Sequence, residues 1–174
     1  VWGAYRDPQA LPLVYGRVTV AGVQYSQDRR EWLIADHAIS GVDRVRRDQV
    51  TTQAWAWRNT VDPSGHPIAI LELAEPLAEG EALAIDVRGA LHPSSGALME
   101  RPDEILWHLL RHVAGLDVDA ADLDTLRAAT WGISLGGVIE DAARTVRATV
   151  DLILASVGGA CSAAAGMAAP GRPR

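Results

Sequence analysis

The stretch that decides the fold runs from His92 to Leu116 and has the sequence HPSSGALMERPDEILWHLLRHVAGL. Residues 93–96 within it, Pro-Ser-Ser-Gly, all favour turns over regular structure. Pro102 follows where a first helical residue is expected, since the N–H that proline lacks has no helical partner at that position. The stretch therefore predicts a turn followed by the first helix of the chain.

The predicted helix has a charged start and one apolar side. Asp103 and Glu104 place negative charge in the first turn, where the helix dipole favours it. Five apolar residues recur at helical spacing and form one stripe: Ile105, Leu106, Leu109, Leu110 and Val113. Gly115 is suited to end the helix, because glycine adopts the left-handed conformation without a steric penalty. We expect Leu109 to lie in the core.

Upstream of this stretch, apolar and polar residues alternate in short segments, as is typical of β-strands. The predicted strands are Leu13–Tyr25 (two strands with a turn at Ala21-Gly22), Glu31–Ile39, Val42–Arg47, Val50–Arg58, His66–Leu73 and Ala82–Val87. Regular turn signals between them indicate a compact antiparallel sandwich or barrel. Val42–Arg47 carries alternating charge, so we predict an exposed or edge strand that a neighbouring copy could extend.

Downstream, the spacing becomes mainly helical, which makes the predicted fold class α+β. Asp117–Thr130 predicts a helix, with Asp119 and Asp122 as a capping pair at its start. Trp131–Ile139 has the character of a short strand with Gly136-Gly137 inside it, and Arg144–Val157 has a regular helical stripe. The predicted parts are an N-terminal arm (1–12), a β-rich domain (13–90), a hinge (91–101), a helical α+β domain (102–158) and a flexible Ala/Gly/Pro tail (159–174).

Composition restricts the classes of partner. The chain has 174 residues, of which 48% are hydrophobic and 22% charged, so it is globular. Its net charge of −6 gives no reason to expect nucleic acid as the partner. The segment 152–171 is uncharged, but it consists mainly of Ala, Gly and Ser, so no membrane insertion is expected.

Few residues could carry chemistry. Glu104, His108 and His112 are spaced to share one helical face, and His at i and i+4 can chelate a metal. The chain lacks further clustered ligands, so we interpret the trio as a polar face opposite the apolar stripe. The single Cys161 excludes an internal disulfide, and its Ala/Gly surroundings supply no base for a nucleophile. The glycines 132, 136 and 137 lack the lysine of a phosphate loop. We therefore predict no catalytic, cofactor or metal residue and no enzyme.

Trp55 and Trp57 lie on one face of a predicted strand. Such a pair can fill a core, form part of a protein interface or stack against a sugar. The sequence leaves these three roles open, and with them a carbohydrate-binding β module as an alternative function. A small metal-dependent hydrolase is the alternative among enzymes.

Four segments resemble the tail-hub or tail-tip (baseplate hub) proteins of long-tailed phages, prophages and gene-transfer particles. The first is Leu13–Val18, together with the two residues before it (LPLVYGRV, residues 11–18). The others are Glu31–Val45 (EWLIADHAISGVDRV), Ala90–Leu116 and Gly132–Ser156 (GISLGGVIEDAARTVRATVDLILAS). The resemblance implies a structural part of the virion tail, made in the bacterial cytoplasm. It also implies a ring of three copies that docks onto tail-tube and fibre or spike proteins. We expect such a protein to act by self-association rather than by catalysis.

Overall fold

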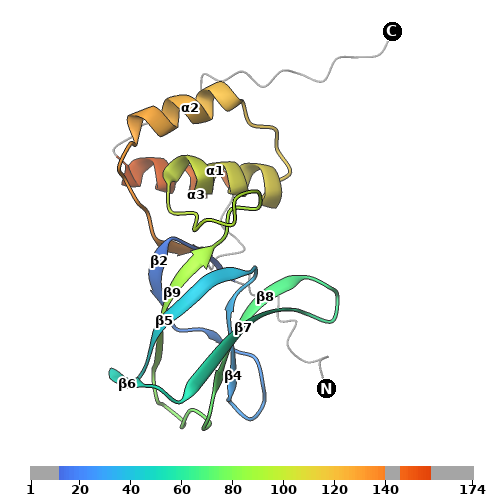
Figure 1. Ribbon diagram of the computed structural model, residues 1–174, viewed down its shortest axis with the longest axis vertical. Helices are drawn as coiled ribbons and strands as arrows, with labels where there is room; N and C mark the ends of the chain where they lie inside the picture. Colours follow the sequence, from blue (N-terminus) through green and yellow to red (C-terminus); the bar gives the residue numbers. More distant parts are fainter. Residues whose placement is uncertain (1–11, 140–145, 158–174) are drawn as a thin grey trace.

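The computed structural model describes residues 12–139 and 146–157. The fold is α+β, as the sequence predicts, with a strand-rich part followed by helices and one short strand. Figure 1 shows the strands gathered in one half of the molecule and the helices α1, α2 and α3 stacked in the other.

The strand-rich part is a sandwich of two four-stranded antiparallel sheets. The first sheet has, in spatial order, β2 (Arg17–Val20), β9 (Leu83–Ala90), β5 (Ile39–Arg47) and β6 (Val50–Thr52). The second has β3 (Val23–Gln24), β4 (Glu31–Ala35), β8 (Pro67–Leu73) and β7 (Trp55–Val61). Strand β9 follows the expected alternation, with Leu83, Ile85 and Val87 buried in the core between the sheets.

Three segments predicted as single strands instead change sheet, and the first, residues 13–20, divides at Gly16 into β1 (Leu13–Tyr15) and β2. Glu31–Ile39 divides after Ala35, and Ile39 begins β5 in the opposite sheet. Val50–Arg58 divides into β6 and β7 around Thr52, whose hydroxyl accepts a hydrogen bond from the Ala54 N–H at 3.2 Å. The polar residues 36–37 and 51–53 interrupt the apolar pattern at these two corners, but they do not indicate which sheet the next strand joins.

The prediction that Val42–Arg47 forms an edge strand is wrong for Val45–Arg47, which pairs with both β9 and β6, whereas among the described residues Val42–Arg44 pairs with β9 alone. This segment belongs to β5, which lies between β9 and β6. Val42 and Val45 are 8% and 0% exposed and belong to the core between the sheets. The charged residues between them point to the outer face of the sheet. These charged residues are the reason why the sequence pattern predicts an exposed strand.

A third, two-stranded sheet connects the C-terminal half to the start of the described chain. Strand β1 (Leu13–Tyr15) pairs antiparallel with β10 (Gly137–Ile139). Backbones cross closely here, because a Cβ on Gly16 would overlap the carbonyl oxygen of Leu135 and a Cβ on Gly136 would overlap that of Arg17. Of the predicted strand Trp131–Ile139, only Gly137–Ile139 is a strand, and Gly136 directly before it permits the crossing.

The first helix forms as predicted. Helix α1 (Pro102–His108) begins at Pro102 and continues into a wider π-helical turn, Leu109–Val113. Gly115 has φ +67°, and the Leu116 N–H donates to the Leu110 carbonyl at 2.8 Å, so the helix ends in a glycine C-cap. Leu109 is 5% exposed and in the core, whereas Val113 is 49% exposed and does not belong to the buried stripe.

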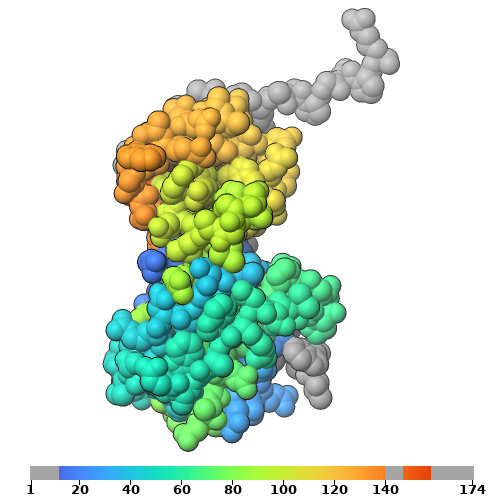
Figure 2. All heavy atoms as spheres, in the orientation of Figure 1, coloured from blue at the N-terminus to red at the C-terminus, as the bar shows by residue number. Residues whose placement is uncertain are grey.

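A second core joins the helices to the sandwich. Its buried residues come from β1, β9, the following turn and the first helix: Tyr15, Ala90, Met99, Ile105 and Leu109. Helix α3 (Val146–Ser156) adds Ile153 to this core, and β10 adds Ile139. Helix α2 (Ala120–Ala129) has no buried residue. Figure 2 shows the result as two lobes with a narrower zone between them.

The predicted hinge, 91–101, contains a bonded turn. Met99 is 0% exposed, its N–H donates to the Ala90 carbonyl at 2.9 Å, and its carbonyl accepts from the Gly16 N–H at 2.9 Å. Only the tip of the turn, 93–97, is fully exposed. Within the described residues no helix is long and apolar enough to cross a membrane. Residues 1–11 of the predicted arm, Cys161 and the predicted tail 159–174 lie outside the described residues.

Candidate functional site

The helix start contains a buried carboxylate. Asp103 is 2% exposed and accepts hydrogen bonds from Arg101 Nε at 3.1 Å and from Arg127 Nε of α2 at 3.0 Å. Burial opposes ionisation of Asp103, but the two guanidinium groups outweigh it and hold its pKa below the usual range. The carboxylate therefore stays charged and ties α2 to α1.

His108 is more buried than the sequence predicted. Its Nδ1 lies 2.8 Å from the hydroxyl of Tyr15, and the ring is half-buried between α1 and β1. Burial raises the pKa of Tyr15, so the phenol stays protonated at pH 7. Burial and the nearby His37, His112 and His92 lower the pKa of His108 to about 4, so its ring is neutral at pH 7. The expectation that His108 lies on an exposed polar face is wrong, because its partner comes from a strand distant in sequence.

Four of the five histidines lie along a continuous series of ring contacts. His92 stacks on Trp107 with centroids 5.0 Å apart, and Trp107 meets His112 edge-on at 4.8 Å. His112 stacks on His108 at 5.4 Å, and His108 contacts Tyr15 at 5.7 Å. The sequence placed His92 as an isolated residue, whereas the turn before α1 folds it back onto the helix.

At the far end of this series, His37 has both ring nitrogens occupied. Its Nε2 accepts from the Val14 N–H at 2.9 Å, and its Nδ1 lies 2.9 Å from the Ala38 carbonyl. These partners require a neutral ring with the proton on Nδ1. Burial, the largest influence, lowers the pKa of His37 and favours the same state. The ring is therefore a structural bridge between β1 and the end of β4.

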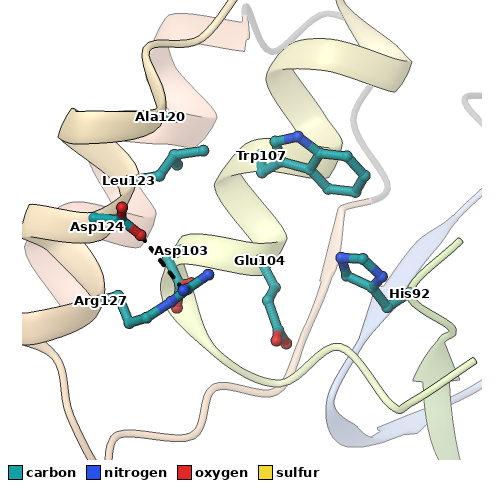
Figure 3. A pocket seen from close by; sticks show the side chains of 8 residues that line it. All are labelled: His92, Asp103, Glu104, Trp107, Ala120, Leu123, Asp124 and Arg127. Atoms are coloured by element: carbon teal, nitrogen blue, oxygen red, sulfur yellow. Dashed lines mark hydrogen bonds and ion pairs between the residues drawn. The ribbon is translucent and has the colours of Figure 1, made fainter. Parts of the chain in front are cut away.

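A hollow of about 190 Å³ lies between α1 and α2. Figure 3 shows Trp107 and His92 on one side, Leu123, Asp124 and Arg127 of α2 on the other, and Glu104 between them. Asp103 lies at its base, already paired with Arg127. Of its polar lining residues, Asp103, Asp124 and Arg127 pair with one another, whereas Glu104, His92 and Trp107 make no ion pair with them.

The metal ligands suggested by the sequence do not converge in the described part of the chain. Among residues 12–139 and 146–157, no three His, Cys, Asp or Glu side chains are placed to hold a metal ion together. The predicted trio Glu104, His108 and His112 is only partly assembled, since His108 bonds to Tyr15 while Glu104 lies near Arg101 at 3.6 Å. The Nδ1 of His92 accepts from the backbone N–H groups of Ser94 and Ser95, at 3.2 and 3.4 Å. The site holds the two halves of the fold together.

The tryptophan pair has a packing role. Trp55 and Trp57 are partly buried, and both pack against the core between the sheets. The indole N–H of Trp55 donates to the Thr52 carbonyl at 2.9 Å, which fixes the corner between β6 and β7. Of the three roles left open by the sequence, packing against the core is the one seen in the structure.

No known protein family, curated protein or solved structure matches this chain. The residues that sequence reasoning missed are His92, Trp107 and Tyr15, whose ring contacts join the two lobes. The sequence does show that histidines are concentrated near α1. It does not show which rings they contact, because these contacts form only when segments distant in sequence pack together.

Proposed function

We propose that this protein is a structural component of the tail tip of a long-tailed phage, prophage or gene-transfer particle. It acts by assembly and docking, and it catalyses no reaction. Its partners are further copies of itself, in a ring of three, and the tail-tube and fibre or spike proteins. It is made in the bacterial cytoplasm and resides in the virion tail.

One observation carries the proposal: the four segments that resemble tail-hub proteins all meet at Tyr15. Tyr15 lies in the first segment and has Gly137 of the fourth as its strand partner. Its ring lies 6.1 Å from that of His37 in the second segment, and its hydroxyl bonds to His108 in the third. Segments far apart in sequence thus form one continuous unit, as expected if they preserve a common fold.

The unit formed by these segments is built for rigidity. Backbone atoms approach so closely that glycine is required at Gly16, Gly89 and Gly136. The hydrogen-bonding groups near the junction, Asp103 and His37 included, are satisfied within the chain. A junction that fixes one lobe on another suits a part that transmits force through contacts, whereas a catalytic site needs unpaired groups that face a substrate.

The two alternative functions have less support. A carbohydrate-binding module would need exposed aromatic faces, whereas Trp55 and Trp57 both pack on the core. A metal-dependent hydrolase would need converging ligands, and the described part of the chain brings no such set together.

Binding to neighbouring tail proteins tests the proposal. The purified protein is mixed with the tail-tube and fibre proteins encoded beside its gene, and complexes are measured by size-exclusion chromatography with light scattering. We expect a defined complex with at least one of them. The same preparation is applied to a glycan array, where sugar binding lost in Trp57→Ala, together with no complex, would contradict the proposal and favour the carbohydrate module.

A further inference from the structure

The outer face of the first sheet carries four arginines. They are contributed by three adjacent strands, β2, β9 and β5: Arg17, Arg88, Arg44 and Arg46. Two carboxylates lie among them, with Asp86 paired to Arg44 at 2.7 Å and Asp43 paired to Arg88 at 2.9 Å. Four positive and two negative charges leave this arginine face with a net charge of +2. Its arginines retain N–H groups for an additional partner.

Helix α2 and the segment before it carry the opposite charge. Four aspartates lie exposed within eight residues: Asp117, Asp119, Asp122 and Asp124. Arg127 is the only basic residue of α2, so this segment has a net charge of −3. Asp117 is fully exposed and lies 3.6 Å from Arg111, while Asp124 lines the hollow toward α1 and pairs with Arg127 at 3.4 Å. Asp122 has no ion-pair partner among the described residues. No residue of α2 is buried, although its ten residues form a regular helix.

An exposed aromatic side chain lies directly beyond this helix. Trp131 is 83% exposed, the largest exposed fraction among the big apolar side chains of the described residues. Tryptophan is enriched at the energetic centres of protein interfaces, and an indole face attracts an arginine guanidinium. Trp131 and the exposed aspartates before and within α2 are here together called the helix face, and their aromatic and acidic groups suit the chemistry of the arginine face.

The two faces lie on different lobes. Figure 1 shows α2 at the end of the molecule remote from the sandwich, while β2, β9 and β5 lie in the sandwich. The helix face therefore does not cover the arginine face of its own chain, but it can meet that of another copy. A ten-residue helix is about 15 Å long, and three adjacent strands span about 10 Å, so the two faces are of similar size.

We propose that copies of this chain associate head to tail, with the helix face of one copy on the arginine face of the next. The proposal rests on the proposed assembly function and names the two surfaces that would carry it. A head-to-tail contact uses two different surfaces and can be repeated, so it generates closed rings or filaments rather than twofold dimers. Helix α2 would then gain the burial that its own chain does not supply.

Two charge-reversal variants test the contact. Variant one carries Asp117→Arg and Asp122→Arg on the helix face, and variant two carries Arg17→Glu and Arg44→Glu on the arginine face. In each variant alone, the helix face and the arginine face carry charge of the same sign. We therefore expect the affinity of self-association, measured by sedimentation velocity, to fall at least about tenfold. In an equal mixture every contact between unlike variants is complementary, so association should return as alternating, even-numbered species, because a ring of three cannot alternate two variants. Wild-type association should weaken as the salt concentration rises from about 0.01 to about 1 M.

A matched control separates specific contacts from net charge. Glu75→Arg with Glu79→Arg changes the net charge as variant one does, but in the loop between β8 and β9, and should associate like the wild type. Circular dichroism establishes that each variant is folded before it is compared. A wild type that stays monomeric to millimolar concentration at low salt overturns the head-to-tail contact, as does a mixture that fails to regain association. Wild-type binding to duplex DNA through Arg17 and Arg44 without self-association also overturns it. Binding to tail-tube proteins is scored separately, so failure of this contact leaves the proposed function testable by itself.

Discussion

Replacement of Leu109 by alanine should weaken the junction between the two lobes more than any nearby change in the same helix. Leu109 is 5% exposed and packs with Tyr15, Ala90, Met99 and Ile105, so its truncation leaves a cavity between α1 and the sandwich. Buried Leu→Ala changes cost about 2–5 kcal/mol of unfolding free energy. For a chain of 174 residues this corresponds to a fall in Tm of roughly 5–15 °C.

Val113→Ala is the matched control for this change. Val113 lies one helical turn further along and is 49% exposed, so its truncation should cost less than about 0.5 kcal/mol, as is typical of surface changes. Thermal and urea unfolding, followed by circular dichroism and tryptophan fluorescence, give both values. Equal losses for Leu109→Ala and Val113→Ala would refute the assignment of Leu109 to the core that joins the lobes.

Three further predictions concern the junction and the sandwich. Gly136→Ala should cost about 1–3 kcal/mol, because its Cβ overlaps the Arg17 carbonyl, whereas Gly137→Ala, with nothing within 4 Å, should be nearly neutral in the same unfolding assay. The folded pKa of His108, about 4, lies below its ordinary value of 6.5, so the unfolded state binds more protons between these values. The free energy of unfolding should therefore fall by about 1–2 kcal/mol as the pH drops from 6.5 to 4, a value that allows for the half-exposed ring. In urea titrations at several pH values, His108→Gln should remove this part of the pH dependence of stability. Trp57→Ala should cost about 1–3 kcal/mol by loss of packing, and a stability equal to that of the wild type would contradict its role in the core.

The parts of the fold with local signals were predictable from the sequence. Pro102 and Gly115 mark the two ends of the first helix by backbone chemistry, and the structure places both where expected. Most strands also appear within a few residues of their predicted positions, because alternation records which side of a strand faces the core.

The parts that depend on partners were not predictable. The pattern in Val42–Arg47 records that one side is polar, but it does not say whether another strand lies beside it. In the same way, the spacing of His108 places it on a helix face, whereas its burial depends on Tyr15, 93 positions earlier in the sequence. The changes of sheet after Ala35 and Thr52 fall at the polar residues 36–37 and 51–53, which do not indicate which sheet the next strand joins.

The position of the protein in a purified particle tests the central claim most directly. Particles induced from the source bacterium are labelled with gold-conjugated antibodies against this chain and viewed by electron microscopy. The account predicts labels confined to the tail end distant from the head, at a constant number per particle. Particles that carry the tail-tube and fibre proteins but no label, with the protein recovered only in the soluble fraction, would contradict it.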